Sequence, residues 1–213
     1  IPNYALIDKY DLHIVGEHYL DIHHHLMGLK GQPISEITEV QSHPMALLQC
    51  ADFFAKYPHI RLVESNDTAE TARRIQEQSL KGIGAIASKT AAKLYDLDII
   101  ANDIHTVKNN TTRFVIVKNE RKEIPKEQIN KASLKFELED QPGNLAKVLT
   151  MISDYNLNMT KILSLPIITT PFQYSFFVDV VFESYRDYQE AKKQLVQMTR
   201  HFKVLGEYKN GKS

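Results

Sequence analysis

The chain has little of what several common protein classes require. Cys50 is its one cysteine, and 26 Lys and Arg residues balance 26 Asp and Glu residues in a chain of 213. A lone cysteine excludes a disulfide within the chain, and its place beside Ala46 and Leu47 in an expected helix predicts a buried structural thiol. The balanced charge, with no basic patch among aromatic residues, argues against a nucleic-acid partner.

Long apolar runs are also missing. No segment approaches the length needed to cross a bilayer, and residues 1–4 form neither a charged leader nor an apolar signal core. We therefore expect a cytoplasmic protein with no membrane partner. The chain does not begin with Met, and Tyr4, Leu6 and Ile7 resemble the end of a helix, so we expect a truncated N-terminus.

The usual signatures of cofactors are absent too. No Gly-rich phosphate loop, Ser-His-Asp order or paired-cysteine site occurs. The run His23-His24-His25, with His13 and His18 before it, is the feature that suggests a metal. In a strand consecutive side chains point to opposite faces, so at most two of the three can converge, and no Cys or acidic partner stands at ligand spacing. We predict no metal site and no cofactor.

In the first half of the chain, segments with strand and helix patterns alternate. The expected strands span residues 12–26, 37–40, 60–64, 82–86 and 113–117, and the expected helices span 44–56, 68–78 and 90–95. Ser42 is expected to cap the first helix, and Asp67 or Thr68 the second. This alternation predicts an α/β unit with a largely parallel sheet, whose ligand would lie at the carboxyl ends of the strands.

A second pattern begins at Ala132. The preceding stretch is rich in charge, contains Pro125 and has no sustained apolar period, which is typical of a solvated linker. The order after it is β-α-β-β-α-β, a ferredoxin-like unit. We therefore predict a first domain at 1–120, a linker at 121–131 and a second domain at 132–213.

Several separate sequence blocks occur in a specific order and spacing. They are Ser42-His43-Pro44 with Gln49-Cys50, Asp67-Thr68-Ala69, Ala85-Ile86-Ala87-Ser88 and Asn110-Thr111-Thr112-Arg113-Phe114. Together they resemble the prephenate dehydratases, the aromatising enzymes of phenylalanine biosynthesis. Three blocks of the second half resemble the ACT domain, a small amino-acid-sensing module: Gln141-Pro142-Gly143-Asn144-Leu145, residues 174–179 and Val204-Leu205-Gly206.

The resemblance implies a fold. It is an α/β catalytic region similar to the two-lobed, type 2 periplasmic-binding proteins, incomplete at its N-terminus, followed by a ferredoxin-like βαββαβ ACT domain. One lobe, from about His13 to Ile100, would be inserted between parts of the other lobe, which the strand from Thr112 rejoins. The substrate would lie between the lobes.

The resemblance also implies a reaction and the residues that carry it. Prephenate loses carbon dioxide and water as its ring becomes aromatic, which needs no metal or redox cofactor. The catalytic residues would be Thr112, which donates a hydrogen bond toward the departing oxygen, and Arg113, whose guanidinium fork suits a carboxylate. The implied substrate-binding residues are Phe114, Asn110, Ser42, His43 and Thr68.

Each of these residues has a plainer interpretation. Thr-Arg-Phe alone fits the start of a strand with a surface Arg113 and a core Phe114. Ser42 and Thr68 alone fit helix caps, and His43 alone fits a structural residue. The surrounding blocks favour the functional interpretation.

The second domain is expected to bind an effector. Gly143, Asn144 and Leu145 open a helix whose free N–H groups could bind an amino-acid carboxylate, or could be only a turn and a helix start. Phenylalanine-regulated relatives carry Glu-Ser-Arg-Pro where this chain has Leu163-Ser164-Leu165-Pro166. The usual phenylalanine contacts are therefore lost, and the added apolar surface predicts a homodimer or homotetramer.

Two other functions remain open. The chain could be a non-catalytic amino-acid sensor, or an inactive fragment of an active enzyme. Turnover of prephenate separates the first from an enzyme, and restoring an N-terminal segment separates the second.

Overall fold

The computed structural model describes residues 3–66, 68–167, 170 and 173–212. The chain forms two compact units: unit 1 contains residues 1–19 and 113–213, and unit 2 contains residues 20–112. Unit 2 is therefore inserted into unit 1. The insertion implied by the resemblance is present, but its limits are residues 20 and 112 rather than 13 and 100.

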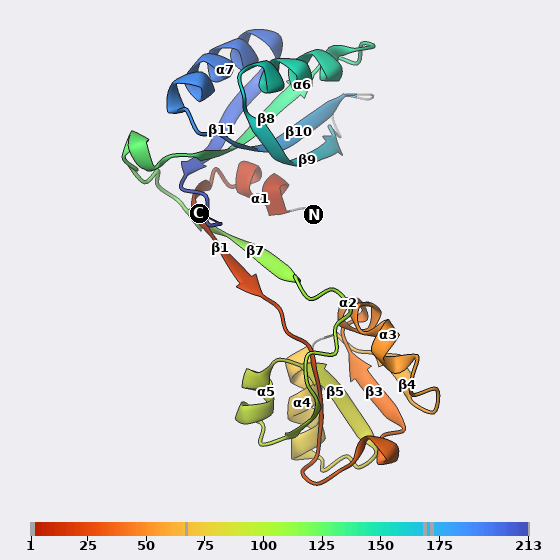
Figure 1. Cartoon of the computed structure of the whole chain (residues 1–213). Coiled ribbons are helices and arrows are strands. Elements are labelled where there is room, and N and C mark those ends of the chain that lie inside the picture. Colours follow the sequence, from red (N-terminus) through yellow and green to blue (C-terminus); the bar gives the residue numbers. More distant parts are fainter. Residues whose placement is uncertain (1–2, 67, 168–169, 171–172, 213) are drawn as a thin grey trace. The chain divides into compact units, whose positions relative to one another are not determined.

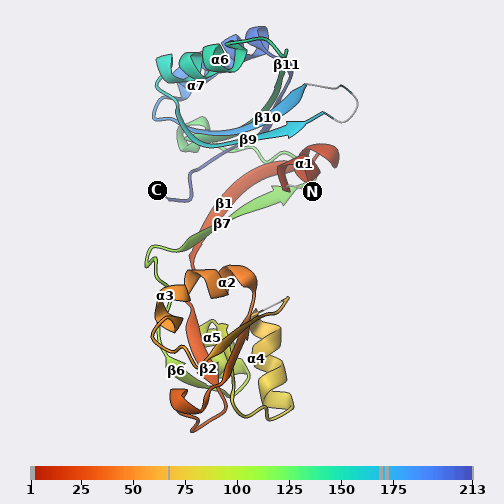
Figure 2. The same cartoon turned by 90° about the vertical axis from the view of Figure 1, so that its right-hand side faces the viewer.

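Unit 2 is built on a five-stranded sheet with the order β4-β3-β5-β2-β6; Figure 1 labels β3, β4 and β5, and Figure 2 labels β2 and β6. The strands are β2 (His25–Gly28), β3 (Glu39–Ser42), β4 (Arg61–Glu64), β5 (Ile83–Ala87) and β6 (Asp98–Ala101). β3 is parallel to β4 and β5, whereas β2 is antiparallel to β5 and β6. The predicted parallel arrangement is confirmed for β3, β4 and β5, whereas β2 runs against its two neighbours. An alternation of elements does not fix the direction of a strand such as β2, which arrives from unit 1.

Helices cover both faces of this sheet. They are α2 (Pro44–Gln49), α3 (Ala51–Phe54), α4 (Thr68–Glu77) and α5 (Lys89–Leu94), with a short 3-10 helix, η1 (Ile34–Glu36), before β3. Neighbouring residues in β2 point to opposite faces, so Leu26 packs with Leu47 and Cys50, while Met27 packs with Ala72 and Ile75. The buried thiol predicted for Cys50 is confirmed, since its exposed fraction is 0%.

The strand expected at 12–26 is in fact two strands. β1 (His13–Asp21) pairs with β7 (Thr111–Lys118) in a two-stranded sheet, and β2 belongs to the five-stranded sheet. Residues 22–24 lie in neither strand, where the Ile22 N–H donates to the Asn110 carbonyl oxygen at 2.7 Å. The alternating pattern continues through this break, which is why the sequence did not reveal it.

The second half of the chain has the predicted βαββαβ order. Its elements are β8 (Lys131–Leu138), α6 (Asn144–Asp154), β9 (Asn158–Pro166), β10 (Tyr174–Val181), α7 (Tyr185–Met198) and β11 (Arg200–Tyr208), after the 3-10 helix η2 (Lys126–Gln128). The strands form an antiparallel sheet in the order β11-β8-β10-β9. Figure 2 shows α6 and α7 together on one face of it.

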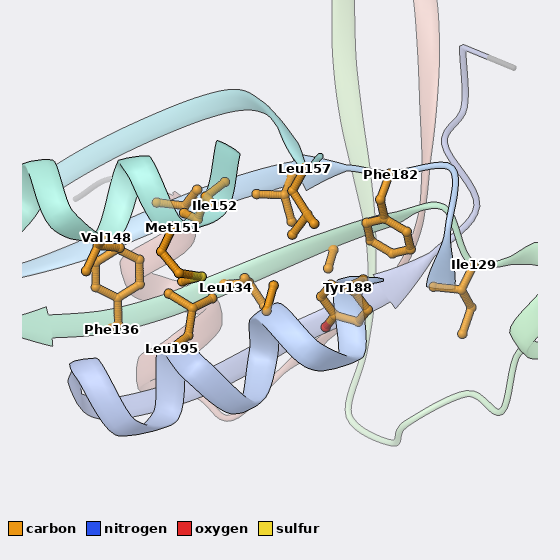
Figure 3. Close-up of a cluster of buried hydrophobic side chains, with 14 of the residues drawn as sticks. Ile129, Leu134, Phe136, Val148, Met151, Ile152, Leu157, Phe182, Tyr188 and Leu195 are labelled. Carbon is orange, nitrogen blue, oxygen red and sulfur yellow. The ribbon is translucent and has the colours of Figure 1, made fainter. Parts of the chain in front are cut away.

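The core of this half lies between that sheet and its two helices. Figure 3 shows Phe136 of β8 with Val148 and Met151 of α6, and Tyr188 of α7 beside Phe182. The Phe182 and Tyr188 rings are stacked with their centroids 4.4 Å apart. This arrangement is the ferredoxin-like packing expected from the sequence.

The other face of the same sheet is covered by the chain itself. Tyr4 and Ile7 of α1 (Asn3–Lys9) are buried against Phe177 and Leu205, and Leu163 and Leu165 pack against this cluster. The apolar surface that led us to expect a second copy thus has cover from α1. The homodimer or homotetramer stays a prediction. No helix among the described residues is long and apolar enough to cross a membrane.

Candidate active site

Unit 2 contains a pocket of about 330 Å³ beside the carboxyl end of β3. Ligands of open α/β sheets bind at this end of the strands. The described residues that line the pocket include no Asp, Glu, Lys or Arg: Ile22, His24, His43, Met45, Ala46, Gln49, Asn66, Asn110 and Thr112. Three predicted site residues, His43, Asn110 and Thr112, are therefore brought together.

The helix that follows β3 is capped differently from the prediction. His43 is the N-cap residue, and its Nδ1 accepts a hydrogen bond of 3.2 Å from the Met45 N–H. The Ser42 hydroxyl, which we expected to cap this helix, is fully buried and donates to the Ile86 carbonyl oxygen at 3.0 Å. This hydrogen bond joins β3 to β5. Its contact with substrate stays a prediction.

Gln49, the last residue of α2, organises the wall of the pocket. Its Oε1 accepts hydrogen bonds from His24 Nε2 at 2.7 Å and from Asn110 Nδ2 at 3.0 Å. Its backbone oxygen accepts from the Thr106 N–H at 2.8 Å. An amide oxygen can only accept, so the Gln49 Nε2 group is the end that can donate to a ligand.

Thr112 and Arg113 are neighbours in β7 with different surroundings. Thr112 is exposed and lines the pocket of unit 2. The Arg113 guanidinium is bonded within unit 1, to the Glu17 and Asp179 carboxylates and to the hydroxyls of Tyr4 and Tyr208. A substrate carboxylate would have to compete with these groups.

The acidic partners of Arg113 are fully buried. The Glu17 and Asp179 side chains have exposed fractions of 0%, and Lys131 also contacts Glu17 at 3.0 Å. Burial alone would raise the pKa of Glu17, but hydrogen bonds from the Gly211 amide, Lys131 and Arg113 hold it below its ordinary value. The cluster is thus a buried, charge-paired network, in which loss of one partner would leave a buried charge uncompensated.

The remaining predicted residues lie elsewhere. Phe114 is in the part of β7 assigned to unit 1, half exposed, so it is not the core residue of the plainer interpretation. Thr68 begins α4, and Asp67 is outside the described residues. Substrate contacts of Phe114 and Thr68 stay predictions.

The predicted effector residues have the expected backbone. Gly143 is the N-cap of α6 and has a φ of 84°, a left-handed conformation that favours glycine. Asn144 Nδ2 donates to the Glu139 carbonyl oxygen at 3.3 Å, and Leu145 packs against the core. The turn and helix start are confirmed, and effector binding stays a prediction.

Three members of the pocket are not among our predicted substrate-binding residues. The sequence suggested Gln49 alongside Ser42 and His43, and Asn66 as a weaker candidate, but neither was assigned to the site. His24 was not considered for it. Gln49 could have been found from its place one turn after Met45, four residues on along the same face of α2. The contact of His24 with Gln49 crosses from one segment to another, which no local pattern shows.

These observations define the class of protein: an α/β unit with a polar pocket, inserted into a unit that carries a ferredoxin-like fold. Family models agree, since "Prephenate dehydratase" matches residues 1–122 and "ACT domain" matches residues 132–197. The chain belongs to the prephenate dehydratase family. These matches are compatible with the predicted domains, whose boundaries stay predictions.

Individual relatives support the family. The chain is 36% identical to a prephenate dehydratase of Methanocaldococcus jannaschii, over 95% of this chain and 73% of the relative. It is 35% identical to arogenate dehydratase/prephenate dehydratase 2 of Arabidopsis thaliana, over 97% of this chain and 56% of the relative. The chain thus spans little more than half the length of several curated relatives that it matches.

Solved structures show the same fold. A protein described as a novel type of quorum-quenching acylase has a TM-score of 0.86 and 27% identity, covering 98% of this chain and 76% of that one. The prephenate dehydratase of Staphylococcus aureus has a TM-score of 0.82 and 24% identity, covering 97% and 76%. The expected fold class, a periplasmic-binding-protein-like catalytic region followed by an ACT domain, is confirmed.

Proposed function

We propose that the protein to which this chain belongs is a prephenate dehydratase that converts prephenate to phenylpyruvate, carbon dioxide and water. The observation that carries the proposal is the meeting of Gln49, Asn110 and Thr112 in one pocket of unit 2. These residues come from two separate family blocks, one with Gln49 and one with Asn110 and Thr112, and they provide amide and hydroxyl groups in a pocket.

The reaction needs little from the protein beyond positioning. The ring carboxylate leaves as carbon dioxide, its bonding electrons enter the ring, and the ring hydroxyl leaves with a proton as water. Thr112 donates a hydrogen bond to the departing oxygen and stabilises the charge that develops there. A threonine hydroxyl is too weak an acid to supply the proton itself, so Thr112 orients and stabilises rather than protonates.

Gln49 and Asn110 hold the substrate in place. The Gln49 Nε2 group can donate to a carboxylate or to the ring hydroxyl while its oxygen stays bound to His24 and Asn110. A side chain held in this way loses less freedom when the substrate binds. Asn66 and His43 complete the polar wall.

Arg113 has two possible functions in this proposal. Its guanidinium suits a substrate carboxylate, as the family resemblance implies, but its contacts in unit 1 favour a positioning residue that fixes β7 next to Thr112. Arg113→Lys tests both, because lysine keeps the charge and loses the planar fork. A positioning residue should lower kcat and the melting temperature together, whereas a carboxylate ligand should chiefly raise KM.

The test is phenylpyruvate formation from prephenate, followed by ultraviolet absorbance in alkali. The wild-type chain, the full natural protein, Thr112→Ala and Gln49→Ala are compared, with Leu94→Ala as the matched exposed control in unit 2. We expect each pocket variant to lose about tenfold to a thousandfold in kcat/KM, and the control to keep its activity. Binding of prephenate without product would instead favour the sensor.

The relatives suggest two further arms of the same assay. Arogenate differs from prephenate by an amino group in place of the side-chain ketone, so both substrates are offered at equal concentration. Acylase activity is measured as amide hydrolysis. The pocket favours an acylase less, because an activated hydroxyl nucleophile needs a base bonded to it. The His24 side chain is bonded to Gln49, and His43 accepts from the Met45 N–H, so neither of these contacts is with the Thr112 hydroxyl.

The ACT domain is proposed to bind an amino-acid effector at the start of α6. Leu163 and Leu165 stand where phenylalanine-regulated relatives carry Glu and Arg, and both pack against the apolar cluster with Tyr4 and Ile7. Phenylalanine should therefore bind weakly. Calorimetry with a set of free amino acids tests this, and phenylalanine binding that Gly143→Val leaves unchanged would contradict a site at this helix.

A further inference from the structure

Three potential metal ligands gather in unit 2, outside the pocket of Gln49 and Thr112. Each of His23, Asp103 and His105 offers one ligand atom, and these atoms all lie within 4.8 Å of one another. His23 belongs to the segment between β1 and β2, while Asp103 and His105 follow β6. The fold thus supplies the acidic partner that the sequence spacing did not show, from a position 80 residues away.

Alternation along the histidine run decides which rings take part. The His23 and His25 rings stack on one side with centroids 6.3 Å apart, and His24 turns to Gln49 on the other. His23 Nδ1 is 2.8 Å from Asp103 Oδ1. His23 and Asp103 are half exposed, so an ion could reach them, whereas His105 is buried at the back.

The donor set fits a particular class of ion. Two imidazole nitrogens and one carboxylate oxygen are ligands of Zn²⁺ and related divalent transition metals, and three protein ligands leave positions open for water. Ca²⁺ and Mg²⁺ prefer a shell of oxygen atoms. The half-exposed Asp103 carboxylate lies in the lining of a cavity of about 550 Å³, together with His23 and His25, which gives an ion a path from solvent.

The loop that carries two of the ligands is already held in place. The Asp103 N–H donates to His25 Nδ1 at 3.1 Å, and Lys108 Nζ donates to the carbonyl oxygens of Asp103 and His105 at 2.6 and 2.9 Å. Asp103 has a left-handed φ of 48°. These bonds fix the backbone of the loop on which the Asp103 and His105 side chains stand.

One contact must change on binding. His105 Nδ1 accepts a hydrogen bond from the His24 N–H at 3.3 Å, which is long for such a bond. If the His105 ring keeps this bond at Nδ1, its proton is on Nε2. The ion therefore replaces either the hydrogen bond at Nδ1 or the proton at Nε2. Neither change disturbs the backbone bonds of the loop.

We propose that His23, Asp103 and His105 bind one divalent transition-metal ion of the Zn²⁺ type. The ion would tie the histidine run to the loop after β6. His24 in the run bonds to the Gln49 side chain and Thr106 in the loop bonds to the Gln49 backbone oxygen, so the ion would also fix two segments that contact this residue. It takes no part in the proposed dehydration, and its binding is measured without turnover.

The test is calorimetric titration of chelator-treated protein with Zn²⁺, together with the visible spectrum of the Co²⁺ form. One ion per chain and a rise in melting temperature are expected. His23→Ala, Asp103→Asn and His105→Gln should each weaken binding by about tenfold or more, and should remove the Co²⁺ bands. The matched control is His59→Ala, since His59 is an exposed histidine of unit 2 away from the cluster.

Asp103→Asn keeps the test valid if a histidine variant does not fold, because asparagine accepts the left-handed backbone. Circular dichroism of the metal-free variants checks this. Wild-type protein that binds no Zn²⁺, or affinity that falls equally in His59→Ala, would overturn the proposal. Binding that all three cluster variants retain would do the same.

Discussion

Arg113 of β7 and Asp179 of β10 form a buried ion pair, with Arg113 Nη1 donating to Asp179 Oδ2. Thr112, one residue earlier, lines the pocket of unit 2. A single strand therefore begins in the candidate active site and continues into a charged network of the ACT sheet. We therefore expect a change that breaks the Arg113–Asp179 ion pair to alter the conformation of β7 next to Thr112.

Removing Arg113 should destabilise unit 1 strongly. Arg113→Ala removes the cation that pairs with the buried Asp179 carboxylate and leaves Glu17 with Lys131 alone, and we expect a loss of about 3–5 kcal/mol in the free energy of unfolding. Arg200→Ala is the control, because Arg200 pairs with Glu139 at the exposed surface of the same unit and should cost less than about 1 kcal/mol. Urea unfolding of both variants measures the difference. Equal losses would show that the buried network has no special weight.

Gly206 should tolerate no side chain. A Cβ at this position of β11 would lie 2.2 Å from the Ile14 carbonyl oxygen, which is backbone and cannot turn aside. Gly206→Ala should therefore cost about 1–3 kcal/mol or more. At Gly16 in β1, the nearest atom to a new Cβ is Ile116 Cδ1 at 3.7 Å, so Gly16→Ala should change stability by less than about 0.5 kcal/mol. Thermal unfolding of the pair decides, and a stable Gly206→Ala would mean that β1 and β11 are farther apart.

Cys50 should be unreactive in the folded protein. Burial raises the pKa of its thiol to about 12, so almost no thiolate forms at neutral pH. A thiol reagent should label Cys50 only when unit 2 opens, and rapidly in guanidinium chloride. Leu48→Cys places a second thiol at an exposed position of α2, two residues before Cys50. This second thiol should react at once. Fast labelling of both thiols in native protein would contradict the packing of α2 and α3.

Acid should weaken unit 1 through Glu17. Its pKa is lower in the folded chain than the ordinary value of 4.5, so the unfolded chain binds more protons as the pH falls. The stabilisation is complete above about pH 4.5 and is lost as the pH falls from there through the folded pKa. Glu17→Gln should flatten this part of the urea-midpoint profile, and Glu190→Gln, at an exposed pair with Lys193, should leave it unchanged. A wild-type midpoint that is constant from pH 6 to 3 would contradict the assignment.

The sequence predicted the features that depend on neighbouring residues. Apolar periods gave the βαββαβ order and helical structure after β3, and the same local pattern predicted that Cys50 is buried. The single helix expected at 44–56 is two helices, α2 and α3, which are separated at Cys50. The turn and helix start at Gly143 also followed from the sequence motif. In each case the structural cause lies within a few positions of the residue.

Features that depend on distant partners were not predicted. Arg113 resembled a surface residue or a substrate ligand because its partners Glu17 and Asp179 lie 96 and 66 positions away. Asp103 was missed as a neighbour of His23 for the same reason. The break after Asp21 was hidden because residues of two different strands happened to share one alternating pattern.

The insertion of unit 2 has a consequence for protein engineering. Its two ends are side by side, since Asp21 Oδ1 accepts from the Thr111 hydroxyl at 2.8 Å and the Asn110 carbonyl oxygen accepts from the Ile22 amide at 2.7 Å. A segment with adjacent ends can be excised and the gap closed by a tight hairpin turn. Residues 20–112 therefore form a segment suited to insertion between two neighbouring antiparallel strands of another protein.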